Sequence, residues 1–214
     1  ELIDQIKKNG HEIGFHTMTH KKLHEIRTKE NFEIELEKFR NIVGNNVKGF
    51  RAPTFSLDSS TSWAIDSLKK FGYSYDSSIV PIKTKMYGLS DADKHPYKIS
   101  SSSIEKHDPK SEFWEFPLMK TKFLGKKIPA GGGFYLRTLP SRIFQKSIKE
   151  YNKKDKPAIM YIHSWELTPE YMPKIDLPIK EKFITYHNIH KSLPKMDELI
   201  KKFKFTSFER YLKE

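Results

Sequence analysis

The feature that most limits the fold of this chain is a repeated change of hydrophobic period. Short apolar runs suited to strands alternate with segments whose apolar residues recur every three to four positions, as they do in amphipathic helices. Residues 31–43 show the helical stripe, and residues 158–162 form an apolar run. Strands that alternate with helices favour a parallel sheet or barrel. We therefore expect a fold of the α/β class.

The same pattern predicts individual elements. Helices are expected at residues 1–9, 31–43, 59–72, 140–151 and 195–203. Strands are expected at residues 11–15, 49–50, 73–76, 113–118, 158–162 and 205–208. A glycine follows three of the predicted helices, at Gly10, Gly44 and Gly72, and glycine is a frequent helix stop.

Length and composition fit a single folded domain over residues 1–214. Of these residues 36% are hydrophobic, enough for a sizeable core. No apolar run reaches the roughly 18 residues that span a bilayer, so no transmembrane segment is expected. Residues 80–135 carry most of the loop signals, and we expect this segment on the substrate side.

Charge and cysteine content narrow the possible chemistry. The net charge is +12, but the lysines are spread along the chain, and no basic stripe interleaved with aromatic residues is present. Such a stripe is typical of proteins that stack nucleic-acid bases, so nucleic acid is not an expected partner. There are no cysteines, so any metal must be held by His, Asp or Glu. The compartment stays open between the cytoplasm and the cell envelope.

Polar residues follow the predicted strands. His16, Arg51, Asp76 and His163 each come at or just after a strand end. In parallel α/β folds, catalytic groups collect at the carboxyl ends of the strands. These four residues are therefore candidates for one functional site.

His16 and His20 are four residues apart. On a helical turn this spacing places both imidazoles on one face, where they can bind one cation. No glutamate lies between them, so the pattern differs from the His-Glu-x-x-His motif of metalloproteases. The alternative is a polar turn capped by Thr17 or Thr19.

The remaining candidates also allow two interpretations each. His163 is either a general acid at a strand end or a hydrogen-bonded core residue. Arg51, beside a proline, either holds a carboxylate or forms a surface ion pair. The three glycines at residues 131–133 lack the Gly-Lys-Ser/Thr of a phosphate loop. They let the backbone pass close to a ligand or turn sharply.

Several stretches, taken in order along the whole chain, share the motifs of one family. They are Gly-His-Glu-Ile-Gly-Phe-His-Thr-Met-Thr-His at 10–20, Gly-Phe-Arg-Ala-Pro-Thr-Phe-Ser at 49–56, Tyr-Asp-Ser-Ser at 75–78, Ile-Pro-Ala-Gly-Gly-Gly-Phe-Tyr at 128–135 and Tyr-Ile-His-Ser-Trp-Glu at 161–166. With these motifs the chain resembles the polysaccharide deacetylases, the NodB-type carbohydrate esterases of family 4. The resemblance is closest to the subgroup of exopolysaccharide gene clusters.

This resemblance implies a distorted (β/α) barrel and a set of site residues. It implies a divalent metal such as zinc held by His16 and His20, with His163 protonating the leaving amine and Arg51 orienting the general base. A third metal ligand and the base itself are implied to be aspartates upstream of residue 1. The positions implied for the substrate or oxyanion are Thr54, Phe55, Asp76, Tyr135 and Trp165.

The implied function is hydrolysis of N-acetyl groups on amino sugars of a polysaccharide, an oligosaccharide or a precursor. Two alternatives stay open: a metal-independent amidohydrolase of the same fold, and a carbohydrate-binding domain without catalysis. Metal content separates the first alternative from the deacetylase, and release of acetate separates the second.

Overall fold

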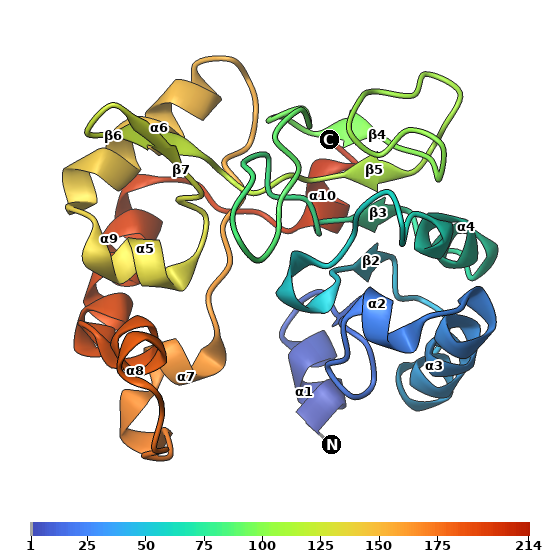
Figure 1. The fold of residues 1–214 in the computed structure, drawn as a ribbon, viewed down its shortest axis with the longest axis horizontal. Coiled ribbons are helices and arrows are strands. Elements are labelled where there is room, and N and C mark those ends of the chain that lie inside the picture. The colour runs from blue at the N-terminus through green and yellow to red at the C-terminus, as the bar shows by residue number, and fades with distance from the viewer. Residues whose placement is uncertain (1) are drawn as a thin grey trace. The chain divides into compact units, whose positions relative to one another are not determined.

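A computed structural model describes residues 2–214 and shows two compact units (Figure 1). Unit 1 contains the residues up to Pro117 together with Thr206–Glu214, and unit 2 contains Leu118–Phe205. Chain segments at both ends of the sequence therefore belong to unit 1. The expectation of one domain over the whole chain stays a prediction.

Unit 1 is built on a five-stranded sheet with the order β1-β2-β3-β5-β4. Its strands are β1 (Gly14–Phe15), β2 (Gly49–Phe50), β3 (Tyr75–Asp76), β4 (Tyr97–Lys98) and β5 (Trp114–Glu115). The strands β1, β2, β3 and β5 are parallel, and β4 runs antiparallel to β5. The parallel register aligns Phe15, Phe50, Asp76 and Glu115, so the chain leaves these strands at one common edge.

Helices of unit 1 follow the predicted apolar stripes closely. They are α1 (Leu2–Lys8), α2 (Leu23–Ile26), α3 (Lys29–Val43), the 3-10 helix η1 (Pro53–Phe55), α4 (Trp63–Lys70) and α10 (Phe208–Tyr211). The helix α3 starts two residues before the predicted one because the Oγ1 of Thr28 accepts the N–H of Asn31. Gly10, Gly44 and Gly72 have φ angles of 75°, 88° and 80°, which confirms them as helix stops.

Aromatic side chains fill the core of unit 1. The ring of Phe15 lies 4.8 Å from that of Phe39, 5.6 Å from that of Phe50 and 6.0 Å from that of Phe32, measured between centroids. Of these four, Phe15, Phe32 and Phe50 are buried, and burial of such a side chain stabilises the fold by about 1.5–3 kcal/mol. This cluster joins α3 to β1 and β2, and it fixes where the strand ends lie.

The C-terminal segment completes unit 1. Phe208 lies with its ring centroid 5.4 Å from Tyr75 and 4.7 Å from Phe116. The predicted strand at residues 205–208 is wrong, because Ser207 caps the helix α10 by accepting the N–H of Arg210. The aromatic residues at this end therefore pack from a helix.

Unit 2 combines a small hairpin with helices. Its elements are β6 (Thr121–Phe123), β7 (Lys126–Ile128), α5 (Gly133–Thr138), α6 (Ser141–Asn152), α7 (Ser164–Leu167), η2 (Pro169–Tyr171), α8 (Ile179–Tyr186), η3 (Ile189–Lys191) and α9 (Ser192–Lys202). The strands β6 and β7 pair antiparallel. A core of Met119, Ala130, Leu136, Phe144, Ile148 and Leu199, among others, holds the helices together.

The predicted buried strand at residues 158–162 is wrong. This segment is extended but makes only isolated backbone bonds: Ile159 O accepts from Met119 N at 2.9 Å, and Tyr161 N donates to Gly131 O at 2.8 Å. The two segments that it contacts cannot extend these bonds into a continuous strand pairing, since Pro117 has no N–H and Gly131 leads into the turn before α5. Only Ile159 of the segment is fully buried.

The α/β class is confirmed by the parallel sheet and its helices. In the described residues the sheet ends at β1 and β4, so closure into a distorted barrel stays a prediction. Within residues 2–214 no helix combines the length and the apolar character that crossing a bilayer requires.

Candidate functional site

His16 and Arg51 lie side by side in unit 1, where each directly follows the carboxyl end of a strand, β1 and β2 respectively. The register places Phe15 opposite Phe50, and the N–H of Arg51 donates to the carbonyl of Phe15 at 3.0 Å. The Nδ1 of His16 lies 2.6 Å from the carbonyl oxygen of Arg51. A carbonyl only accepts, so Nδ1 carries the proton and Nε2 keeps its lone pair. Metal-binding histidines are typically oriented by such a bond on the other ring nitrogen.

The imidazole of His20 lies next to that of His16, with 5.0 Å between ring centroids and an interplanar angle of 73°. The predicted helical turn is wrong, because Thr17 and His20 have left-handed φ angles of 59° and 57° and residues 16–22 contain no helix. Burial lowers the pKa of His16, which favours the neutral form that binds metal.

Two adjacent imidazoles fit a zinc-like ion as part of its ligand set. Within residues 2–214 no group of three or more His, Cys, Asp or Glu side chains lies close enough together to hold a metal. His16 and His20 could therefore supply two ligands of a larger set, and their role as metal ligands stays a prediction.

Arg51 binds the ends of the neighbouring strands. Its Nε donates to the carbonyl of Ser77 at 2.8 Å, and its Nη2 donates to Oγ of Ser77 at 2.7 Å. The same hydroxyl donates to the carbonyl of Phe116 at 2.7 Å. The guanidinium is thus fixed across β2, β3 and β5, which a simple surface pair would not require.

The turn after Arg51 has an unusual backbone. Thr54 and Phe55 have φ angles of 52° and 55°, in the left-handed region that costs a residue other than glycine about 1 kcal/mol or more. The Oγ of Ser78 accepts the N–H of Ala52 at 2.7 Å and holds the turn. Among residues 2–214 the N–H of Thr54 has no acceptor. With Thr17 and His20, four left-handed residues follow β1 and β2, a pattern typical of functional sites.

A pair of buried carboxyl groups lies beneath this turn. Asp76 and Glu115 are register partners on β3 and β5, and both are completely buried. Asp76 accepts from Oγ of Ser78 at 2.5 Å, and Oε1 of Glu115 accepts from the N–H of Ile79 at 2.9 Å. The Oε2 atom of Glu115 has no hydrogen-bond partner in the described part of the chain.

Burial changes the titration of both carboxyl groups. It raises the pKa of Asp76 to about 6. Burial, and next the charge of Asp76, raise the pKa of Glu115 well above its usual range. The pair therefore holds a proton at neutral pH. Because Asp76 is inaccessible, its predicted contact with substrate stays a prediction, and the geometry supports a positioning role through Ser78 and Ala52.

In unit 2, His163 is oriented by a buried carboxylate. Its Nδ1 lies 3.1 Å from Oε2 of Glu166, and the same oxygen accepts the N–H of His163 at 3.0 Å. The other oxygen of Glu166 is paired with Nη1 of Arg137. Glu166 and Arg137 are 2% and 1% exposed, whereas the side chain of His163 is 51% exposed. This exposure disfavours the interpretation of His163 as a core residue.

Arg137 is anchored in turn by helix α8 and the residue that follows it. Its Nε donates to the carbonyl of His187 at 2.8 Å, and its Nη2 donates to the carbonyls of Ile184 and Thr185. These carbonyls lie at the C-terminal end of α8, where a cation is favoured. The network therefore fixes Glu166 and, through it, the ring of His163.

The three glycines make room for this network. A β-carbon on Gly131 would lie 2.8 Å from the carbonyl oxygen of Ile159, and one on Gly132 would lie 2.7 Å from Oη of Tyr161. On Gly133 it would lie 2.2 Å from Oε2 of Glu166. Of the two interpretations of the glycine run, the structure supports close approach, and the group approached belongs to the protein.

Two of the aromatic candidates, Tyr135 and Trp165, lie in unit 2. Trp165 stacks on His163 at 5.2 Å between ring centroids with an interplanar angle of 17°. Tyr135 on α5 contacts Phe134 edge to face at 5.4 Å. The structure thus brings Trp165 to His163, while the substrate role of both aromatic residues stays a prediction.

Sequence reasoning missed several residues of these networks: Ser77, Ser78, Glu115, Arg137 and Glu166. The sequence does contain a sign of Glu115, because this carboxylate interrupts an otherwise apolar predicted strand at residues 113–118. Glu166 gave a weaker one, because a carboxylate three residues after a helix cap often accepts the N–H of that cap.

Comparison with known protein families divides the chain at the end of β3. Residues 1–75 match the polysaccharide deacetylase family, and residues 77–213 match a domain of unknown function, DUF3473. The second match covers well over half of the 214 residues. No curated protein matches the chain.

Proposed function

This chain belongs to the DUF3473 family, and its residues 1–75 match the polysaccharide deacetylases, a combination typical of the exopolysaccharide-cluster deacetylases. On that premise we propose that it removes N-acetyl groups from the amino sugars of a polysaccharide or its precursor. The observation that carries the proposal is the pair His16 and His20. Both imidazoles lie together at the strand edge, and Arg51 holds the ring of His16 in the tautomer that leaves Nε2 unprotonated.

His16 and His20 would hold a divalent metal such as zinc. Such an ion, when bound, polarises the acetamide carbonyl and activates water for attack. The protein's own share near this position is the N–H of Thr54, which has no acceptor in residues 2–214 and would donate to the oxygen that becomes negative.

His163 would complete the reaction as general acid. Water adds to the carbonyl carbon and loses two protons, one to the general base that the resemblance implies and one that restores His163. The C–N bond breaks, acetate leaves, and the amine nitrogen takes a proton from the imidazolium of His163. Because Glu166 accepts from Nδ1, Nε2 is the nitrogen that delivers the proton. In unit 2, Trp165, stacked on His163, and Tyr135 would offer apolar surfaces to the sugar, and in unit 1 Phe55 would do the same.

Calorimetric titration with zinc tests the metal pair. We expect one site per chain in the unaltered protein, lost in His16→Ala and in His20→Ala but retained in His11→Ala, a histidine of the same unit outside the pair. A site that persists in His16→Ala would contradict the assignment. Binding of no zinc at all would favour the metal-independent amidohydrolase.

Acetate release decides between catalysis and binding alone. We expect the zinc-loaded protein to release acetate from an N-acetylated chitooligosaccharide, and His163→Gln to reduce the rate by about 10²–10⁴-fold, as loss of a general acid does. Binding of the oligosaccharide without any acetate would establish the carbohydrate-binding function instead.

A further inference from the structure

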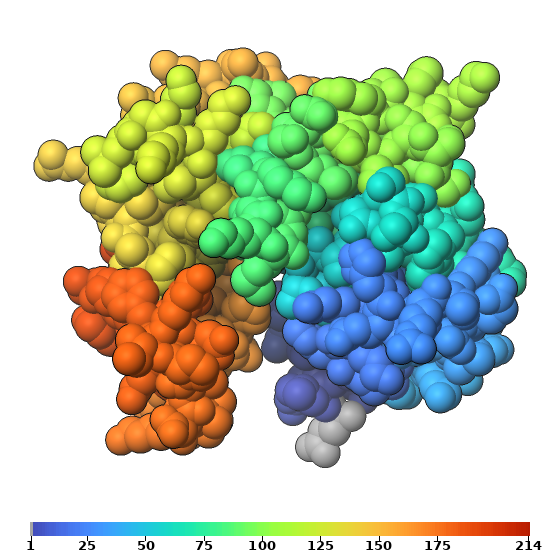
Figure 2. Space-filling model, in the orientation of Figure 1, coloured from blue at the N-terminus to red at the C-terminus, as the bar shows by residue number. Residues whose placement is uncertain are grey.

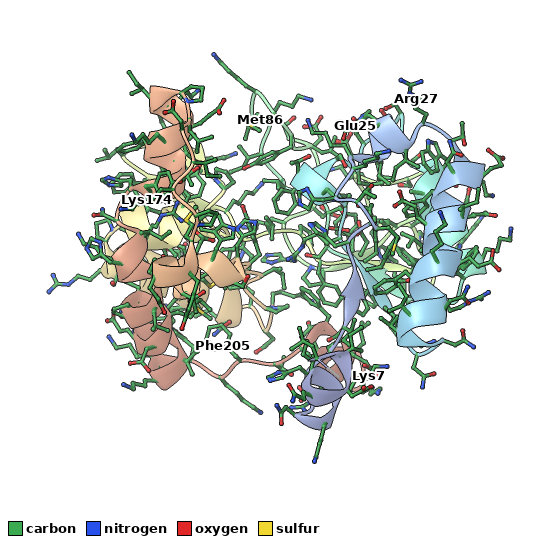
Figure 3. The ribbon with its side chains drawn as sticks, turned by 90° about the horizontal axis from the view of Figure 1, so that it is seen from below. Lys7, Glu25, Arg27, Met86, Lys174 and Phe205 are labelled. Atoms are coloured by element: carbon green, nitrogen blue, oxygen red, sulfur yellow. The ribbon has the colours of Figure 1, made fainter. Side chains whose placement is uncertain are left out.

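Unit 1 contains a pocket of about 410 Å³ that begins at the turn of Thr54 and Phe55. One wall comes from Lys22, His24 and Glu25, the floor from residues 54–58, and the other wall from residues 83–89. Figure 2 shows the segment around residues 80–90, in green, at the surface of unit 1 next to the cyan turn that contains Thr54. Figure 3 labels Glu25 and Met86, two of the lining residues. No role has been assigned to this pocket so far.

The wall at residues 83–89 is a rigid loop. The N–H of Leu89 donates to the carbonyl of Val80 at 2.9 Å, which closes the loop. Inside it, Oγ1 of Thr84 accepts the N–H groups of Met86 and Tyr87 and donates to the carbonyl of Tyr87. Gly88 has a φ of 106°, and a β-carbon there would lie 2.0 Å from the carbonyl oxygen of Ile82. The loop therefore presents its side chains in a fixed arrangement.

Aromatic rings from two segments meet at this pocket. Phe55, from the floor, and Tyr87, from the loop, lie 5.3 Å apart between ring centroids at an angle of 60°. Apolar faces with a few polar groups around them are the usual lining of a site for a small organic ring. The pair therefore suits a sugar unit rather than an ion alone.

The acidic and basic side chains around the pocket differ in their contacts. Both carboxylates bind groups of the protein: Glu25 accepts the N–H of Lys22 at 2.7 Å, and Asp58 accepts from Ser60 and from Nε2 of His24 at 2.9 Å. The ammonium groups of Lys22, Lys83 and Lys85 are exposed, and none forms an ion pair within the described residues. The lining therefore has three lysines against two carboxylates, and the carboxylates already accept hydrogen bonds from the protein while the lysines point their charge to solvent.

We propose that this pocket binds a carboxylate-bearing sugar of the polymer, so that the substrate is an acidic polysaccharide. The lysines would hold the carboxylate, and the rings of Phe55 and Tyr87 would pack on the sugar. The proposal rests on the proposed function, because the pocket shares Thr54 and Phe55 with the candidate site. It adds the chemical class of the substrate, which the family alone does not give.

Binding of two defined oligosaccharides tests this. We compare a hyaluronan hexasaccharide, which alternates N-acetylglucosamine with glucuronic acid, with neutral chitohexaose by calorimetry at 50 and 300 mM NaCl. We expect the acidic oligosaccharide to bind on the order of tenfold more tightly, a ratio that corresponds to about 1.4 kcal/mol. The higher salt should reduce this preference, because salt screens exposed charges.

Matched lysine variants test which residues cause the preference for the acidic oligosaccharide. Lys83→Gln/Lys85→Gln should remove the preference while chitohexaose binds as before, and Lys83→Arg/Lys85→Arg should keep it. Lys126→Gln/Lys127→Gln removes the same charge from exposed positions on β7 and should change nothing. Circular dichroism spectra that match those of the unaltered protein show that each variant is folded.

Equal affinity for both oligosaccharides, no binding of either, or an equal loss in the Lys126/Lys127 variant would overturn the proposal. Acetate release is measured separately with both oligosaccharides. Release from both at equal rates, without preference in binding, would overturn the acidic pocket and leave the deacetylase function standing. A preference for the acidic oligosaccharide in binding, without release of acetate from either, would overturn the deacetylase function and leave the acidic pocket standing.

Discussion

Gly133 lies directly against the carboxylate of Glu166, so closely that a β-carbon on the glycine would stand 2.2 Å from Oε2. The same oxygen orients His163, and the other oxygen is paired with the buried Arg137. The absence of a side chain at Gly133 is therefore a condition for the geometry of the proposed general acid. It links the glycine run at residues 131–133 to chemistry without any contact with a ligand.

Gly133→Ala should displace Glu166 and lower the free energy of unfolding by about 1–3 kcal/mol, as overpacking of a buried site does. Urea unfolding measures this. For comparison, a β-carbon on Gly14 would lie 3.3 Å from the nearest atom, the carbonyl oxygen of Gly49, so Gly14→Ala should cost less. An equal or larger loss in Gly14→Ala would contradict the steric explanation.

Glu166→Gln should destabilise the protein by about 3–5 kcal/mol, because it leaves the charge of Arg137 buried without its partner. The pair is 1% and 2% exposed. Lys146 and Glu150, on the surface of α6, form a matched exposed pair at 4.0 Å. Since such surface pairs contribute little, Glu150→Gln should leave the urea midpoint unchanged. Similar midpoints for both variants would show that the buried pair does not stabilise unit 2.

The buried pair Asp76 and Glu115 should make stability fall as the pH rises. Both groups have raised pKa values when folded, so the folded state binds more protons than the unfolded state above the unfolded values near 4. The stabilisation is complete below those values. It should decrease as the pH rises through about 6, the pKa of Asp76, and further at higher pH for Glu115.

Urea unfolding between pH 4 and 7.5 measures this dependence. The loss is at most about 1.4 kcal/mol per pH unit for each proton retained by the folded state. Glu115→Gln should flatten the curve, whereas Glu112→Gln, whose side chain is 85% exposed three residues earlier, should leave it unchanged. A curve equally steep in Glu115→Gln would contradict a proton held by the pair.

Much of the fold could be predicted from hydrophobic period and glycine position. The helix α3 contains the apolar stripe of residues 31–43, and it ends at Gly44 as predicted. The strand ends at His16 and Arg51 were predicted as well, because a short apolar run before a polar residue marks where a parallel strand stops. These features are local, and a local pattern is enough to find them.

The details of the candidate site depend on contacts that no local pattern contains. His16 and His20 meet through a left-handed turn, stabilised from outside by the carbonyl of Arg51, 35 residues from His16. Asp76 and Glu115 become neighbours only through the pairing of β3 with β5. Residues 158–162 have the composition of a strand, but the neighbours they find offer single hydrogen bonds.

Residues 206–214 have a consequence for how the protein is made. Phe208 packs on Tyr75 and Phe116, and the N–H of Glu209 donates to Glu12, so unit 1 is completed by a segment that is synthesised after all of unit 2. Unit 2 is continuous and all of its residues precede this segment. During translation, unit 2 can therefore fold before unit 1 is complete, because the rings of Tyr75 and Phe116 stay uncovered until residues 206–214 have been synthesised.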